Sequence, residues 1–218
     1  MRADAAAPLP LFFLRAALAL AVVMAAWWGV KQWTALPAAW LTKWGAEAVF
    51  SDLLRQVDVE NGQIVAESYL RPDPTRLAPG QRPQGAQAVL VAELDVAKYT
   101  YGLPLLFALL LAGSRHRLLR QMLLGYLALL PAQALCNALV LASQIALSAG
   151  AAVSAQAGWS RWQLDLLAYG YQISVLLLPT LVPVLLWLWL DRRFFVAVLL
   201  EGWLRNAPMR EQERKPKP

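Results

Sequence analysis

Charged residues are scarce in this sequence. Asp, Glu, Lys and Arg account for 16% of its 218 residues, whereas an ordinary globular domain has about 25%. Hydrophobic residues account for 59%, above the roughly 45–50% of a globular domain. A soluble domain with so few charges could not cover its apolar surface, and a disordered chain needs low hydrophobicity. These proportions exclude both classes and indicate an integral membrane protein.

Cysteine and histidine occur once each, as Cys136 and His116. A single cysteine cannot form an intramolecular disulfide, and one histidine excludes a histidine-rich metal cluster. Catalysis by this pair would require a hydrogen bond between them, but Cys136 lies within an apolar run and His116 in a basic segment outside it. Glycine-rich phosphate loops, CxxC pairs, HExxH and GxSxG are also missing. We therefore expect no catalytic, cofactor or metal site.

The net charge is +6, but its distribution does not indicate a nucleic-acid partner. The excess is concentrated in residues 114–121 and 191–218, which both flank apolar runs. Positive charge beside membrane spans is typical of cytoplasmic loops. We therefore interpret the excess as a topology signal and expect the lipid bilayer, not nucleic acid, as a partner.

Four apolar runs predict four transmembrane helices, over residues 9–30, 99–113, 122–149 and 164–190. A span needs about 20 residues to cross about 30 Å of hydrocarbon. The second run is shorter than this, so it is either a short span or a re-entrant segment. The first run has the length of a span, but it could also be a cleavable signal peptide. Trp27 and Trp28 directly follow its best cleavage site, so we favour a retained anchor.

The basic residues of the short loops predict the orientation. Arg115, Arg117 and Arg120 place the loop 114–121 in the cytoplasm, and the basic tail 191–218 belongs on the same side. Residues 1–8 then also lie in the cytoplasm, and residues 31–98 and 150–163 lie outside it. The sequence thus predicts a multi-pass membrane protein with both termini cytoplasmic.

Residues 31–98 predict a small extracytoplasmic α+β insertion that begins with a helix. Over residues 33–55 apolar side chains recur at spacings of three and four, which predicts an amphipathic helix with Pro37 near its first turn. Trp33, Trp40 and Trp44 share one face, which favours a helix lying in the outer interface of the bilayer. The alternative is a helix that caps the bundle and buries the same tryptophans in protein.

Residues 57–97 predict a three-stranded antiparallel sheet. Residues 57–60 alternate, Asn61-Gly62 is a strong two-residue hairpin signal, and residues 63–70 continue as the returning strand. Residues 71–85 hold four prolines and two glycines and predict a loop, after which residues 88–97 alternate again. The fold class expected for the whole chain is therefore a mainly α membrane protein with four transmembrane helices and this insertion.

Polar side chains recur in the third and fourth spans. Three of them lie four and seven positions apart, on one face of a helix. They predict either hydrogen bonds between helices or a polar pathway for a substrate, and the prolines of these spans should bend the helices. The candidate contacts with neighbouring helices or with a partner are Gln133, Asn137, Gln144, Gln172, Trp40 and Trp44.

The stretch Tyr99-Thr100-Tyr101-Gly102-Leu103-Pro104 opens the second apolar run, after an anchor helix and a compact outer segment. With two further spans, this layout resembles the exosortase H-associated membrane proteins. These are small bacterial proteins encoded beside an exosortase, a multi-span thiol transpeptidase that processes proteins with a C-terminal sorting signal. The resemblance implies a non-catalytic accessory subunit of a protein-sorting system in the bacterial inner membrane, with an exosortase-like partner, and it carries over no functional residues.

Two other functions are compatible with the sequence. The polar residues and proline-interrupted spans are also expected of a small transporter or permease component. The four-span layout with an outer platform is shared by subunits of conjugation or secretion apparatus.

Overall fold

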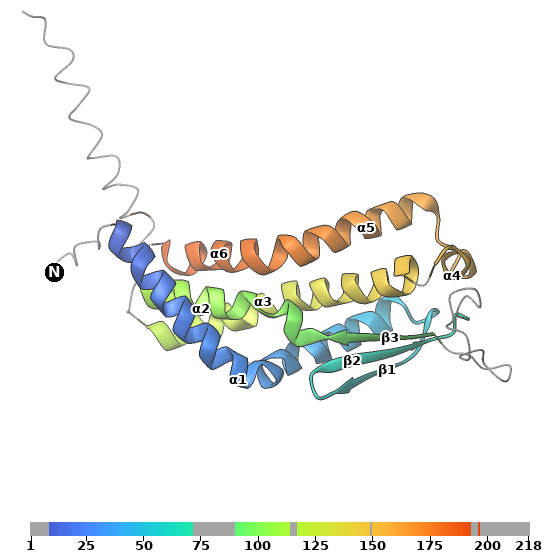
Figure 1. Ribbon diagram of the computed structural model, residues 1–218, viewed down its shortest axis with the longest axis horizontal. Helices are drawn as coiled ribbons and strands as arrows, with labels where there is room; N and C mark the ends of the chain where they lie inside the picture. Colours follow the sequence, from blue (N-terminus) through green and yellow to red (C-terminus); the bar gives the residue numbers. More distant parts are fainter. Residues whose placement is uncertain (1–8, 72–89, 114–116, 149, 193–195, 197–218) are drawn as a thin grey trace, which may run out of the picture.

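The computed structural model describes residues 9–71, 90–113, 117–148, 150–192 and 196. The fold is mainly helical, and Figure 1 shows one small sheet along one side of the helices. A 3-10 turn η1 (Val96–Tyr99) precedes α2, and a π-helical turn η2 (Gln144–Ser148) follows α3. The other elements are α1 (Leu9–Val49), β1 (Leu54–Glu60), β2 (Gln63–Ser68), β3 (Leu90–Asp95), α2 (Gly102–Ala112), α3 (Leu118–Ser143), α4 (Ala151–Gln156), α5 (Arg161–Leu176) and α6 (Leu178–Leu190).

Three of the predicted segments fall largely or wholly outside the described residues. They are the N-terminal residues 1–8, the loop 71–85 and the tail 191–218.

Helix α1 is one continuous helix of 41 residues. The sequence predicted a span over 9–30 and a separate amphipathic helix over 33–55, whereas the structure joins them and ends the helix at Val49. Lys31 and Gln32, at the expected break, are good helix formers, so nothing there stops the helix. At 1.5 Å per residue α1 is about 60 Å long, roughly twice the thickness of the hydrocarbon.

Pro37 lies in the interior of α1 and not in a first turn, contrary to the prediction. Proline has no N–H, so the carbonyl of Trp33, four residues earlier, loses its helical hydrogen bond. Figure 1 shows that α1 changes direction near its middle, and a proline is a sufficient cause of such a bend. Beside this position, the hydroxyl of Tyr126 on α3 donates to the carbonyl oxygen of Thr34 at 3.0 Å. Helix α3 therefore supplies a hydrogen-bond donor close to the bend.

The predicted three-stranded antiparallel sheet is confirmed, with the strand order β1-β2-β3. Glu60 pairs with Gln63, and Asn61 and Gly62 between them both have positive φ, 49° and 79°. Positive φ at both positions defines the type I′ turn that Asn-Gly favours. Strand β1 begins at Leu54, earlier than predicted, on the far side of a β-bulge.

Within the described residues, two helices are long and apolar enough to cross a membrane, over Leu11–Val49 and Leu118–Leu147. Helices α5 and α6 pass the same test only together, as one span bent by 57°. Helix α2 has 11 residues and rises about 16 Å, which is less than the hydrocarbon thickness. The structure thus supports two or three spans in a mainly helical protein, and the fourth span stays a prediction.

Two predicted loops contain helical residues. Arg117 has a φ of 60°, and α3 begins directly after it at Leu118, inside the predicted loop 114–121. Gly150 has a φ of 102° and separates η2 from α4, which lies inside the predicted loop 150–163.

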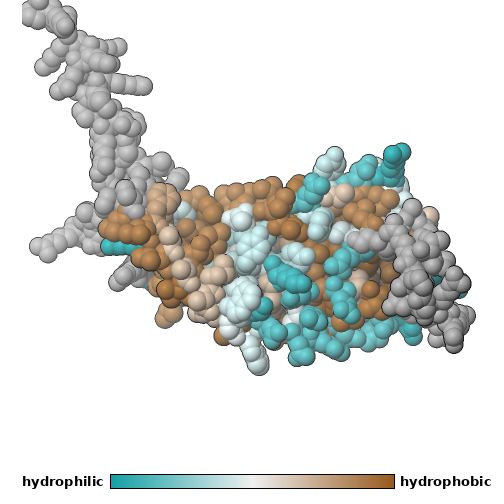
Figure 2. Space-filling model, viewed as in Figure 1, coloured by the Kyte–Doolittle hydropathy of each residue, from teal (hydrophilic) through white to brown (hydrophobic). Residues whose placement is uncertain are grey.

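The core has two parts. The first lies between the sheet, α1 and α3, where Ala35, Ala38 and Ala39 of α1 have no exposed surface. The second surrounds Trp27 and Leu106 and joins the first half of α1 to α2, α3 and α6. Figure 2 shows hydrophobic residues gathered at the end of the molecule where α2 and α6 lie, and hydrophilic residues over the sheet. The two cores therefore correspond to an apolar helical end and a more polar end that carries the sheet.

Replacing Gly62 by alanine should destabilise the sheet by about 1–2 kcal/mol, because a residue with a Cβ pays that amount in the left-handed region. The new Cβ would lie 3.6 Å from Gln32, an ordinary contact, so the effect would come from the backbone alone. Thermal unfolding in detergent measures it. Asn61→Gly is the control and should leave the melting temperature unchanged or raise it. A Gly62→Ala variant with the melting temperature of the wild type would contradict the turn geometry.

Candidate partner-binding surface

Two prolines interrupt the helix pair α5–α6. Pro179 and Pro183 have no N–H, so the carbonyl oxygens of Val175 and Pro179 lose their helical donors. Within a membrane such a group costs several kcal/mol unless another donor reaches it. The bend of 57° between α5 and α6 lies at this position.

The start of α2 covers both of these carbonyl groups. The hydroxyl of Tyr101 donates to the carbonyl oxygen of Val175 at 3.3 Å. Gly102 packs so closely that a Cβ built on it would lie 2.6 Å from the carbonyl oxygen of Pro179 and 2.9 Å from Cγ of Pro183. A side chain at position 102 would therefore force the helices apart. We call these five residues the proline junction.

Helix α3 donates to two further carbonyl groups of α5 and α6. The thiol of Cys136 donates to the carbonyl oxygen of Ser174 at 3.0 Å, and the side-chain amide of Gln121 donates to that of Leu190 at 3.2 Å. Cys136 is only 1% exposed. A buried thiol of this kind acts as a small apolar side chain with a weak donor.

The two polar residues predicted near the middle of the third span are buried. Gln133 is 5% exposed and Asn137 has no exposed surface. Nδ2 of Asn137 donates to the hydroxyl oxygen of Thr42 on α1 at 3.4 Å, and Thr42 donates to the carbonyl oxygen of Ala38 at 2.7 Å. Asn137 therefore links α3 to the second half of α1.

The other two predicted polar residues lie in different surroundings. Gln144 is half-buried in η2, and Gln172 is exposed on α5. The four side chains therefore do not share one environment, and only Asn137 makes a hydrogen bond to another helix among the described residues.

Trp40 and Trp44 are exposed, by 45% and 62%. Their ring centroids lie 6.4 Å apart, and the ammonium group of Lys43 lies 5.6 Å from the centroid of the Trp40 ring. The buried face of α1 is occupied instead by small residues such as Ala38 and Ala39. The protein's own bundle therefore does not bury these tryptophans, and their face is open to lipid or to another protein.

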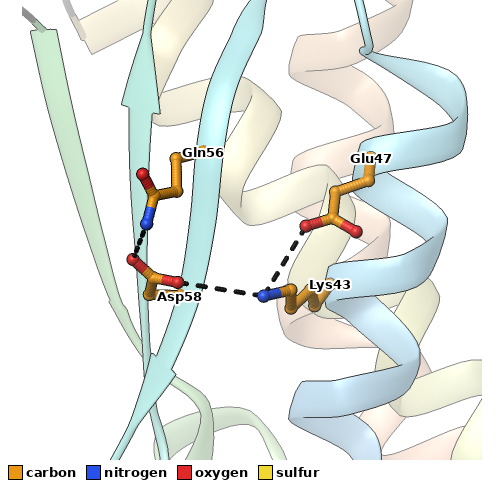
Figure 3. A network of polar contacts seen from close by, with 4 residues as sticks. All are labelled: Lys43, Glu47, Gln56 and Asp58. Atoms are coloured by element: carbon orange, nitrogen blue, oxygen red, sulfur yellow. Dashed lines mark hydrogen bonds and ion pairs between the residues drawn. The ribbon is translucent and has the colours of Figure 1, made fainter.

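Charged groups join the second half of α1 to the sheet (Figure 3). Nζ of Lys43 lies 3.7 Å from Oε1 of Glu47 and 3.8 Å from Oδ1 of Asp58 on β1. Nε2 of Gln56 donates to Oδ2 of Asp58 at 2.7 Å. Partly exposed ion pairs contribute at most about 1 kcal/mol each. These ion pairs indicate that this part of α1 lies in a polar environment.

A groove of about 500 Å³ runs between the second half of α1 and α3, with one residue of α5 at its margin. Apart from one threonine, every side chain along it is apolar, and we call it the α1–α3 groove. It is lined by Leu41, Thr42, Gly45, Val49, Phe50, Pro131, Ala134, Leu135, Ala138, Leu139, Ala142 and Leu167.

Gly45 is the least expected residue of this groove. Glycine in a helix costs about 1 kcal/mol relative to alanine. A Cβ built on Gly45 would nevertheless meet no atom within 4 Å, so the described chain does not need a glycine there for its own packing. Small residues on membrane helices let a neighbouring helix approach closely.

A family model described as exosortase H-associated membrane protein matches residues 6–194. The chain belongs to this family. The match includes every helix and strand named above and confirms the resemblance seen in the stretch 99–104. Neither the curated proteins nor the solved structures contain a match.

Sequence reasoning missed several residues that shape this exosortase H-associated protein. Thr42 and Gly45 were not singled out, although a glycine inside an apolar helical pattern is itself a signal. Tyr126 could not be assigned a role, because its acceptor Thr34 is distant in the chain. Tyr101 and Gly102 were noticed as part of a motif, and the structure gives them a physical role at the proline junction.

Gly102→Ala should destabilise the protein by about 2–3 kcal/mol, because the rigid backbone of Pro179 cannot yield to the new methyl group. Tyr101→Phe should cost about 1–3 kcal/mol, since it leaves the carbonyl oxygen of Val175 without its donor. Thermal unfolding in detergent measures both changes. Tyr169→Phe is the control, because Tyr169 is 67% exposed, and a Tyr101→Phe variant as stable as this control would contradict the role of the hydroxyl.

Proposed function

We propose that this protein is a non-catalytic accessory subunit that binds a multi-span, exosortase-like transpeptidase in the bacterial inner membrane. The observation that carries the proposal is the open, apolar α1–α3 groove with Gly45 on its wall. The family description supports a partner that is itself associated with the membrane.

The groove suits an apolar helix of the partner that lies beside the sheet, at the outer end of the bundle. Along α3 it extends from Pro131 to Ala142, which is about three helical turns. Ala134, Ala138 and Ala142 recur every four residues and so form one stripe. Close approach of a second helix to this stripe and to Gly45 would bury apolar surface and gain van der Waals contact.

A non-catalytic role agrees with the surroundings of the single cysteine. Cys136 is buried and donates to the carbonyl oxygen of Ser174, whereas a nucleophilic thiol needs access and an adjacent base. The polar residues of α3 favour contacts between helices over transport. Asn137 is fully buried against Thr42, while Gln172 is exposed on another helix.

The proposed orientation has both termini in the cytoplasm and the sheet outside it. Lys43, Glu47 and Asp58 support a position of the sheet outside the hydrocarbon, because charged side chains are costly within it. Arg117 and Arg120 beside the start of α3 favour a cytoplasmic location of that end.

Gly45→Leu should prevent the partner helix from entering the groove. We expect the amount of exosortase that co-purifies in mild detergent with the tagged protein to fall by at least about tenfold, which corresponds to a loss of about 1.4 kcal/mol. Gly29→Leu is the matched control, because a Cβ on Gly29 of α1 also meets no atom within 4 Å. Normal recovery with Gly29→Leu and loss with Gly45→Leu is the expected result.

Two other outcomes have distinct meanings. If the wild-type protein recovers no exosortase from co-expressing membranes, the proposed function is wrong. If Gly45→Leu recovers as much exosortase as the wild type, the partner binds another surface and the groove has no part in the complex.

Reporter fusions test the orientation. A green fluorescent protein fused after residue 218 should fluoresce, because this reporter folds in the cytoplasm. Alkaline phosphatase fused after Arg71, which follows β2, should be active, because this enzyme requires the oxidising compartment outside. The reverse pattern of the two reporters would overturn the proposed topology.

A further inference from the structure

A small cavity lies beside the proline junction, at the meeting point of α2, α3 and α6. Tyr99 of η1 and Gly102 of α2 line it on one side, Gln133 and Cys136 line it from α3, and Pro179 from α6. Its volume is about 10 Å³, which is close to the smallest space that holds one ordered water molecule. The cavity is thus too small for any organic ligand.

Gln133 gives this cavity a polar wall. The side chain is 5% exposed, and neither Oε1 nor Nε2 has a hydrogen-bond partner among the described residues. A buried amide without partners is unfavourable, and such groups in proteins are normally bonded to protein or to ordered water. Gln133 offers one acceptor oxygen and two N–H donors at this position.

Pro179 of α6 contributes a second polar group near this cavity, its backbone carbonyl. Pro183 removes the helical donor of the Pro179 carbonyl, and this oxygen adjoins Gly102, since a Cβ on Gly102 would lie 2.6 Å from it. Gly102 and Pro179 both line the cavity. Gln133, whose amide has no partner among the described residues, and Pro179, whose carbonyl has lost its helical donor, therefore line the same cavity.

We propose that this cavity is a binding site for a single water molecule. The water accepts a hydrogen bond from Nε2 of Gln133 and donates to the carbonyl oxygen of Pro179, so that it joins α3 to the bend of α5–α6. Buried waters typically make about three hydrogen bonds, and Oε1 of Gln133 can accept a hydrogen bond from the second O–H of the water. Gln133 is thereby a positioning residue for the proline junction, in addition to the direct bond made by Tyr101.

Solid-state NMR of the full-length protein in lipid bilayers tests the site. Magnetisation transfer from water to side-chain amides is compared for three residues, with the Gln133 signal assigned by its loss in Gln133→Met. We expect Gln133 to receive water magnetisation on the time scale of Gln63, which is exposed on β2. The side-chain amide of Asn137, which has no exposed surface and whose Nδ2 is bonded to Thr42, should receive it more slowly. Transfer to Gln133 as slow as transfer to Asn137 would overturn the proposal.

Hydrogen exchange tests the link to the bend. In Gln133→Met the backbone amides of Thr180 and Leu181, which donate to Leu177 at the break, should exchange about tenfold faster, as expected for the loss of one net hydrogen bond. Gln172→Met serves as the control and should leave these rates unchanged. Wild-type exchange rates in Gln133→Met would show that no water bridges Gln133 to Pro179.

Discussion

A carbonyl group inside a membrane has no water to bond, so each proline in a membrane helix requires a hydrogen-bond donor from another part of the protein. Tyr101 meets this requirement, because its hydroxyl donates to the carbonyl that Pro179 leaves free. In α1, Tyr126 donates to the carbonyl of Thr34, which is next to the carbonyl of Trp33 that Pro37 leaves free. Gly102 then allows α2 to lie directly against the carbonyl of Pro179. Helix α2 is too short to span the membrane alone. Its position is fixed by the hydroxyl of Tyr101, which donates to Val175, and by the absence of a side chain at Gly102, which permits the close contact with Pro179.

The sheet could be predicted from the sequence because its signals are local. The Asn61-Gly62 turn sets the register, and alternation along β2 sets the buried face. The junction between the two halves of α1 could not be predicted from hydrophobicity, because Lys31 and Gln32 change the polarity of the chain without ending its helix. The donor at the bend of α5–α6 was equally out of reach, since Tyr101 and Val175 are 74 positions apart and no periodic pattern connects them.

The buried and the open surfaces of the helices have different physical origins. Gln133 and Asn137 could be recognised as polar residues of one helical face, and both lie inside the protein. The α1–α3 groove could not be predicted, because a groove is the space that remains after helices have packed. The one sequence signal for the groove is Gly45, which lowers helix stability although the packing of the described chain does not require a glycine there. At the groove, a glycine lowers the stability of α1 and at the same time leaves room for a neighbouring helix.

The short connection between β3 and α2 has a consequence for the order in which the protein assembles. Only η1 and two residues separate Asp95 from Gly102, and the carboxylate of Asp95 accepts a hydrogen bond from the N–H of Ala97 to start that turn. The β1–β2 hairpin closes through neighbouring residues and can form as soon as it is synthesised, whereas α6 is made last. Once β3 pairs with β2, the sheet holds the first residue of α2 in place. Tyr101 and Gly102 are therefore already in position when the bend of α5–α6 packs against them.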